Sequence, residues 1–274
     1  MKHLNWHLAL FLVTAVVAFP GTLAATDGGG SLEHDDHGGQ QPPPPGVEGE
    51  ACESGVSSGF ACRGVELLRR LTPEELGGGS ASDSWGWKDP QSGRYYALVA
   101  RSSGTTFVDV TDPREPVVVG ILPSEGEPQP WRDVKTYANH AFIVADNVPQ
   151  HGMQVFDLTR LRGVTSQQTF ATDAHYSSFG TAHNIAIDEE SGYAYVVGSD
   201  SCSGGLHMID IRDPKNPAFL GCYTEDGYTH DVQCLVYDGP DTDYTGRQVC
   251  LASNEDSLTI VDVTTKDAPI TVAK

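Results

Sequence analysis

Phe107-Val108-Asp109-Val110 is the first of four copies of one motif, an aspartate between apolar residues. The other copies are Val155-Phe156-Asp157-Leu158, Met208-Ile209-Asp210-Ile211 and Ile260-Val261-Asp262-Val263. Successive aspartates lie 48, 53 and 52 residues apart. A period of this length indicates a repeat protein in which each copy marks one structural unit.

Strand-like runs surround each copy of the motif. One apolar run precedes it, at 95–99, 141–145, 193–197 and 249–252. A shorter run lies further upstream and includes Trp85-Gly86-Trp87, Arg132-Asp133-Val134, His183-Asn184-Ile185 or His230-Asp231-Val232. Asp-Pro turns after two of the motifs lead into a last apolar run, at 117–122 or 218–222. Four strands per repeat predict an all-β chain, a β-propeller with about four visible blades of four strands.

The composition fits such a fold and excludes some partners. The chain has 17 Lys and Arg against 37 Asp and Glu, a formal net charge of −20. Nucleic-acid binding needs clustered basic residues that neutralise phosphates, so we exclude it. The same charge disfavours docking on anionic lipid. The 30 glycines and 17 prolines indicate many turns and few long helices.

Composition divides the chain before the repeats into three segments. Residues 1–25 have the pattern of a secretory signal peptide, and Pro20 and Gly21 interrupt the apolar run before it is long enough to span a membrane. Residues 26–50 are rich in glycine and proline and predict a disordered tether. Residues 51–80 predict a cysteine loop and a short helix, with Thr72 as N-cap and Pro73 at the first helical position. Residues 81–274 hold the repeats, and we expect an extracellular, secreted protein.

The tether contains His34-Asp35-Asp36-His37, whose side chains can bind metals. Because an unstructured cluster binds metal ions weakly, we interpret it as solvated linker.

Export to an oxidising compartment makes the six cysteines interpretable as three disulfides. Pairing of neighbours joins Cys52 to Cys62, Cys202 to Cys222 and Cys234 to Cys250. The repeat register supports this pairing, because Cys234 and Cys250 fall on the first and second strands of one blade. Other connectivities remain open, since spacing alone does not fix them.

Several stretches resemble the choice-of-anchor B proteins, a family with LVIVD repeats. Leu258-Thr259-Ile260-Val261-Asp262 matches the repeat, and 131–134, 182–186 and 228–234 look like other parts of that family. The likeness runs from about Cys52 to the last residue. It implies a secreted or surface-attached β-propeller whose biochemical role is not established. The run 270–274 looks like an interrupted strand, so we expect a truncated propeller.

In a propeller the first strand of each blade lines the central channel, so its polar residues meet at one end of the axis. This places the ligand-binding candidates at that axial mouth: Arg132, Asp133, His183, Asn184, His230 and Asp231. Asp133, His183 and His230 suit a divalent cation, either calcium or zinc. The alternative is that these residues bond to neighbouring blades and fix their register. We expect His151 and His207 to be packed or loop histidines instead.

Two further motifs carry less information. The run 241–246 has the opening spacing of a calcium loop, with Asp241 and Asp243 as ligands, but Ala252 stands where that loop needs a glutamate. An Asp- and Gly-rich hairpin loop explains the same residues. Gly55-Val56-Ser57-Ser58-Gly59 matches the nucleophile motif G-x-S-x-G by letter, but it lies inside the 52–62 cysteine loop, so we dismiss it.

No motif identifies a reaction, and we assign no catalytic residue. The leading hypothesis is a non-enzymatic binding or adhesion propeller that presents loops to a protein or glycan partner. The alternative is a metal-dependent hydrolase or lyase at the axial mouth. In it Asp133, His183 and His230 hold the metal, and Asp231 or Arg132 acts as base or charge stabiliser.

Overall fold

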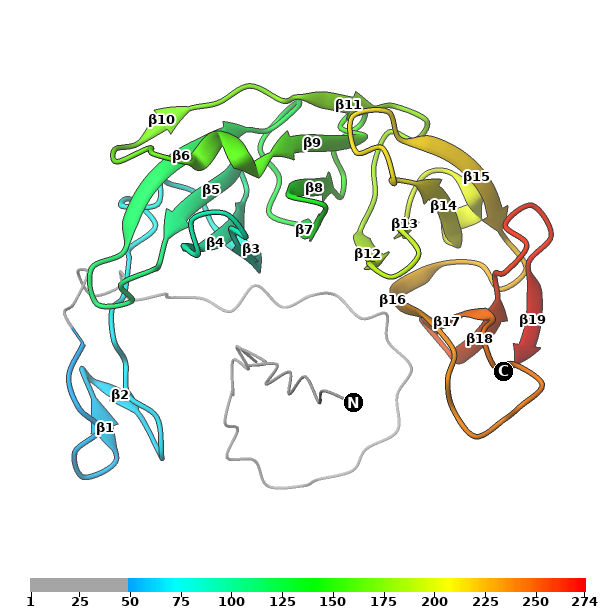
Figure 1. Ribbon diagram of the computed structural model, residues 1–274, viewed down its shortest axis with the longest axis horizontal. Helices are drawn as coiled ribbons and strands as arrows, with labels where there is room; N and C mark the ends of the chain where they lie inside the picture. Colours follow the sequence, from blue (N-terminus) through cyan, green and yellow to red (C-terminus); the bar gives the residue numbers. More distant parts are fainter. Residues whose placement is uncertain (1–48) are drawn as a thin grey trace, which may run out of the picture. The chain divides into compact units, whose positions relative to one another are not determined.

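The computed structural model describes residues 49–274 (Figure 1). The signal peptide predicted at 1–25 and nearly all of the tether predicted at 26–50 lie outside this range. Strands and turns make up almost all of the described chain. Between residues 49 and 274 no helix has the length and apolar character to cross a membrane. The prediction of an all-β fold is confirmed.

Four sheets, each built on four antiparallel strands, follow one another in chain order (Figure 1). The first sheet contains β3 (Ala81–Lys88), β4 (Tyr95–Arg101), β5 (Gly104–Asp109) and β6 (Val117–Pro123). The second contains β7 (Arg132–Tyr137), β8 (His140–Ala145), β9 (Met153–Asp157) and β11 (Ala174–Tyr176). The third contains β12 (Asn184–Asp188), β13 (Tyr193–Val197), β14 (Leu206–Asp210) and β15 (Ala218–Tyr223). The fourth contains β16 (Thr229–Val236), β17 (Gln248–Asn254), β18 (Leu258–Asp262) and β19 (Ile270–Ala273). The four-strand unit is confirmed, whereas a closed propeller and its blade number stay predictions.

Smaller elements complete the described chain. β1 (Val56–Ser57) and β2 (Phe60–Ala61) form a hairpin inside the first cysteine loop. There are two short 3-10 helices: η1 (Leu158–Leu161) lies between β9 and β10, and η2 (Cys202–Gly204) lies between β13 and β14. β10 (Gln168–Thr169) comes from the second repeat but pairs in parallel with β6, which gives the first sheet a fifth strand.

The aspartate of each motif ends the third strand of its sheet. Its carboxylate accepts a hydrogen bond from the backbone N–H two residues later, in a bond that closes the turn. The four bonds are Thr111 N to Asp109 (3.0 Å), Thr159 N to Asp157 (3.1 Å), Arg212 N to Asp210 (3.0 Å) and Thr264 N to Asp262 (2.9 Å). Part of the acidity of the chain is therefore a property of the repeat.

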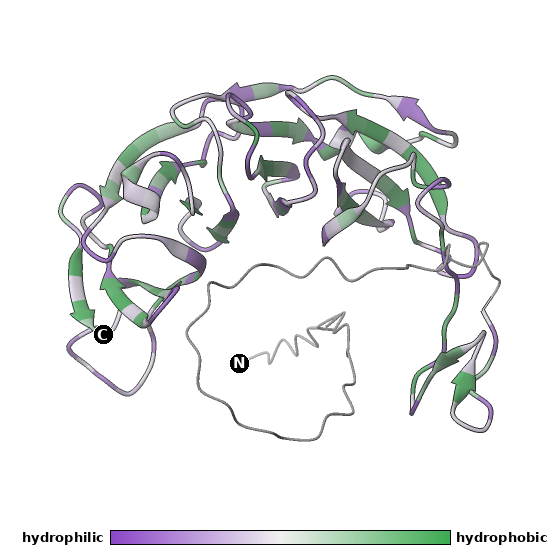
Figure 2. Cartoon of the chain, turned by 180° about the vertical axis from the view of Figure 1, so that it is seen from behind, coloured by the Kyte–Doolittle hydropathy of each residue, from purple (hydrophilic) through white to green (hydrophobic). Residues whose placement is uncertain are grey.

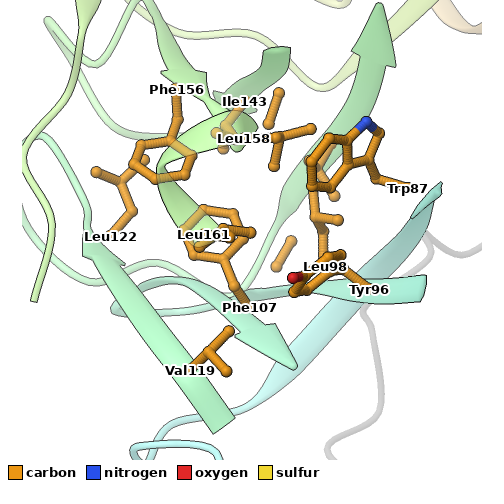
Figure 3. Packing of buried hydrophobic residues seen from close by; sticks show 13 residues of the cluster. Trp87, Tyr96, Leu98, Phe107, Val119, Leu122, Ile143, Phe156, Leu158 and Leu161 are labelled. Atoms are coloured by element: carbon orange, nitrogen blue, oxygen red, sulfur yellow. The ribbon is translucent and has the colours of Figure 1, made fainter. Parts of the chain in front are cut away.

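The apolar core lies between successive sheets. Residues on alternate faces of a strand serve different interfaces: Ile185 of β12 packs toward the second sheet, and Ala186 packs toward the fourth. Figure 3 shows the interface of the first two sheets, where the rings of Phe107 and Phe156 stack with centroids 4.6 Å apart. Hydrophobic colouring accordingly concentrates on the strands in Figure 2. Each sheet is stabilised by its neighbours in the row.

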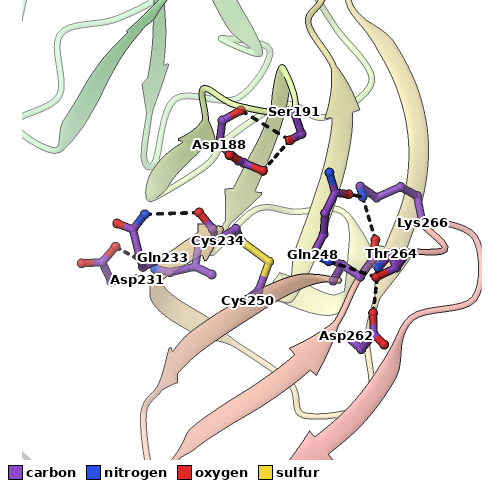
Figure 4. Close-up of a disulfide and its surroundings, with 12 residues drawn as sticks. Asp188, Ser191, Asp231, Gln233, Cys234, Gln248, Cys250, Asp262, Thr264 and Lys266 are labelled. Carbon is purple, nitrogen blue, oxygen red and sulfur yellow. Dashed lines mark hydrogen bonds between the residues drawn. A yellow bond between two sulfur atoms is a disulfide. The ribbon is translucent and has the colours of Figure 1, made fainter. Parts of the chain in front are cut away.

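Three disulfides join cysteines that are neighbours in the sequence. They are Cys52–Cys62, Cys202–Cys222 and Cys234–Cys250. Cys234 on β16 lies directly opposite Cys250 on β17, and Figure 4 shows this bridge. The described chain contains no free cysteine.

The short helix predicted after Thr72 is wrong, because the chain makes only a turn there. Its start is as predicted: Thr72 N donates to the Glu75 carboxylate (2.7 Å), and Glu75 N donates to Thr72 Oγ1 (3.2 Å). Gly77, Gly78 and Gly79 then adopt positive φ angles, which end the helical path at once.

Candidate functional site

A recurring bond joins the first strands of successive sheets. β3 contacts β7, β7 contacts β12, and β12 contacts β16. Asp83 accepts from Val134 N (3.1 Å), and Asp133 accepts from Ile185 N (2.9 Å). Asn184 continues the pattern by donating from Nδ2 to the His230 carbonyl (3.3 Å). Asp133 and Asn184 therefore fix strand register, as in the structural alternative. We call these three contacts the first-strand bonds.

Asp133, which accepts one of the first-strand bonds, is buried, with 3% of its surface exposed. Its second oxygen pairs with Lys135, whose Nζ also lies 3.7 Å from Asp83. Burial raises the pKa of the Asp133 carboxyl to about 7. The neighbouring Asp83 also raises this pKa, whereas the charge of Lys135 lowers it. Lys135 in turn lies over the Trp85 ring, 4.6 Å from its centroid.

The Arg132 guanidinium is buried and bonds to Ser124 and to His151 Nε2 (3.0 Å). Because guanidinium has only donors, His151 accepts through Nε2 and donates from Nδ1 to the Gly152 carbonyl (3.0 Å). Burial lowers the pKa of Arg132 to about 10, and Arg101 adds to this effect. Arg132 Nε has no partner within the described residues.

His183 and His230 face each other across the third and fourth sheets. Their Nε2 atoms lie 3.1 Å apart, and the rings meet at 60°. His183 Nδ1 lies 2.9 Å from the Asp146 carboxylate, which also accepts from Asn147 N (2.7 Å). His230 is exposed, and the His183 side chain is 19% exposed. The two histidines thus occupy equivalent positions in successive repeats and lie in contact.

Two hollows that share residues open along the first strands. The smaller has a volume of about 180 Å³ and is lined by Ser82, Asp83, Trp131, Arg132, Asp133, His183 and Asn184. The larger has a volume of about 740 Å³ and receives residues from the first strand of every sheet. Its lining includes Asp83, Trp85, Asp133, Lys135, Asn184, Glu189, Asp231, Leu251 and Leu258. We call the larger hollow the first-strand groove.

The predicted metal ligands do not assemble as proposed. From residue 49 onward, no group of three or more His, Cys, Asp or Glu side chains could hold a metal ion. Asp133 fails to join His183 and His230 because its oxygens are taken by Lys135 and Ile185 N. In the 241–246 loop, Asp241 accepts from Asp243 N (3.1 Å), as the hairpin-loop alternative expects.

The remaining sequence candidates are structural. His151 is fully buried, and His207 is 2% exposed, as expected for packed histidines. Ser57 of the G-x-S-x-G motif is buried and accepts from Leu67 N (3.2 Å). Asp83, Lys135 and Asp146 were not among the predicted site residues. Asp83 lies 50 residues before Asp133, so the repeat interval could have found it. Asp146 lies in the turn after β8 and carries no such signal.

Comparison with known proteins identifies the repeat. Residues 179–225, which include the whole third sheet, match the LVIVD repeat. Among solved structures, the chain is similar to "a functionally unknown protein from Desulfotomaculum acetoxidans DSM 771", with 14% identity and a TM-score of 0.52. The alignment covers 76% of this chain and 58% of that protein. No curated protein matches. These matches support a repeat-containing, β-propeller-like fold.

Proposed function

We propose that the protein is a secreted or cell-surface β-propeller of the choice-of-anchor B type that binds a cationic segment of a partner protein in the first-strand groove. The LVIVD repeat and the four-stranded units support the propeller assignment. Three disulfides and the signal-like residues 1–25 support export.

The charge of the groove carries this proposal. Asp83, Glu189 and Asp231 line it beside the buried Asp133. Lys135 is the one lysine of the lining, and it already pairs with Asp83 and Asp133. The net charge of −20 extends the same field over the whole protein. A groove with a surplus of carboxylates attracts lysine and arginine side chains and speeds their encounter.

Exposed apolar side chains give the groove a second kind of contact. Trp85 is 40% exposed and Leu258 is 53% exposed, and both line it. Exposed tryptophan and leucine beside carboxylates suit a peptide with mixed basic and apolar residues. A glycan is the other partner to test, because tryptophan faces and carboxylates also suit sugars. The metal-dependent hydrolase or lyase stays an untested prediction.

Binding of a lysine- and arginine-rich peptide tests the proposal, with a glycan array in parallel. Glu189→Gln with Asp231→Asn removes two groove charges. At about 0.5 kcal/mol for each exposed charge pair, we expect about fivefold weaker peptide binding. Glu115→Gln with Glu127→Gln is the matched control, since both residues are exposed and absent from the groove lining. Equal weakening by both variants, or binding of glycans instead of peptide, would refute the proposal.

A further inference from the structure

We infer that His183 and His230 form a binding site for a divalent transition-metal ion that prefers imidazole ligands, of which Zn²⁺ is the type. The inference does not depend on the partner proposed above. It departs from the metal set predicted from the sequence, because Asp133 is replaced by Asp146 and Asp146 supports a ligand without touching the metal.

Hydrogen bonding assigns the proton on His183. A carboxylate only accepts hydrogen bonds, so the 2.9 Å contact with Asp146 places the His183 proton on Nδ1. With that proton on Nδ1, the neutral form of the His183 ring presents a bare lone pair at Nε2. Asp146 is itself fixed by Asn147 N, so the direction of that lone pair is set by the fold.

The contact between the two rings requires a cation or a proton. Two bare nitrogens 3.1 Å apart repel each other unless something positive lies between them. His230 can supply a proton from Nε2, and it can also take its other tautomer and leave both nitrogens free for a metal. In that exchange the His230 proton moves from Nε2 to Nδ1, so no net proton is lost.

The separation is close to what a metal needs. Two imidazole nitrogens at about 2.0–2.1 Å from a tetrahedral Zn²⁺ lie about 3.3 Å apart. From the observed 3.1 Å the two nitrogens must move apart by a few tenths of an ångström, and the rings, whose centroids are 4.3 Å apart, must turn apart with them. Imidazole nitrogens select zinc-like ions over calcium and magnesium, which prefer oxygen. Water can complete the coordination, because His230 is exposed.

The surroundings hold His183 in place. Asp146 on Nδ1 makes the carboxylate–histidine pair that commonly orients a metal-binding imidazole. Gly198 lies against the base of the His183 side chain, where a Cβ would come within 2.6 Å of the His183 Cβ and 2.7 Å of the Tyr228 hydroxyl. The site is therefore built from three sheets: Asp146 follows β8, His183 precedes β12, and His230 lies on β16.

Calorimetric titration with ZnCl₂ tests the inference on the whole chain, produced without a histidine tag. We expect one Zn²⁺ at this site and no binding of Ca²⁺ or Mg²⁺ there. His183→Ala and His230→Ala should each abolish that binding, and Asp146→Asn should weaken it about 10- to 100-fold. His34→Ala with His37→Ala is the matched control, because it removes the other His/Asp cluster of the chain and should leave the site intact.

Two results of this titration would overturn the inference. One is the absence of Zn²⁺ binding to the unaltered chain. The other is binding that survives His230→Ala, a substitution at an exposed residue that tests the site even where His183→Ala fails to fold. Anomalous scattering from a Zn²⁺-soaked crystal gives the location independently: a peak away from the two Nε2 atoms would refute the assignment.

Discussion

We predict that acid destabilises this protein through its buried histidines, and His207 provides the sharpest test. The His207 ring is 2% exposed, with Ser201 Oγ 2.7 Å from Nδ1 and the Tyr176 hydroxyl 2.9 Å from Nε2. Burial lowers the pKa of the His207 imidazole to about 4. In the unfolded chain the same group titrates near its ordinary pKa of about 6.5.

The sign of the effect follows from which state binds the proton. Between pH 6.5 and 4 the unfolded chain binds more protons than the folded chain, so stability is full above pH 6.5 and falls as the pH decreases. At pH 5 the unfolded imidazole is almost fully protonated and the folded one almost fully neutral. The 1.5 units between pH 6.5 and pH 5 correspond to about 2 kcal/mol of lost stability.

Other groups also titrate in this range, so a variant must isolate the contribution of His207. Burial lowers the pKa of His151 to about 4 as well, which adds a loss of the same sign. Asp133 acts oppositely: its raised pKa, about 7, makes the folded state gain stability as the pH falls. His207→Gln keeps a hydrogen-bonding side chain that does not titrate, and leaves His151 and Asp133 unchanged.

Urea unfolding followed by tryptophan fluorescence at pH 7.5 and pH 5.0 measures the difference. Between these two pH values, the unaltered chain should lose about 2 kcal/mol more stability than His207→Gln. Equal losses for His207→Gln and the unaltered chain would refute the argument, whatever the absolute stability of the variant.

Three more predictions concern stability, all measured by urea unfolding. Arg162→Ala should lower the stability, because the Asp89 side chain is buried and its carboxylate accepts from Arg162 Nη2 (2.7 Å) across 73 residues of sequence. An unchanged urea midpoint would contradict this. Gly120→Ala should cost about 1–3 kcal/mol, because its Cβ would lie 2.2 Å from the Phe170 ring, whereas Gly86→Ala meets nothing within 4 Å and should be nearly neutral. Replacing Cys234 and Cys250 together by alanine should cost about 3 kcal/mol, since their 16-residue separation closes a loop inside the fourth sheet, and an unchanged midpoint would show the bridge to be dispensable.

The sheets were predictable because their signals are local. The aspartate that ends each third strand bonds only two residues away, so the same letters recur wherever that turn is needed. The histidine pair was predictable in position, since both histidines occupy equivalent places in the repeat. Its partner Asp146 was not, because a turn residue bonded across 37 residues has no periodic signature.

The directions of long side chains and the positions of very short strands could not be predicted from the sequence. Nothing in the sequence shows that Arg132 turns toward His151, since a guanidinium reaches in many directions from the same backbone position. β10 has two residues, too few for any alternation of apolar and polar side chains, and its parallel partner lies in another repeat. The helix predicted after Thr72 does not form, because three consecutive glycines destabilise a helix more than good capping residues stabilise it.

The first-strand bonds also govern how freely this scaffold can change. Each one ends on a backbone N–H or carbonyl of the next strand, so the receiving residue contributes nothing but its main chain. Any residue except proline can donate at positions 134 and 185, and any residue at all can accept at position 230. In each of these repeats, one polar side chain thus helps to align adjoining sheets without fixing the identity of its partner residue. The other groove-lining residues do not take part in these bonds. Related chains can therefore acquire different binding specificities on one unchanged framework.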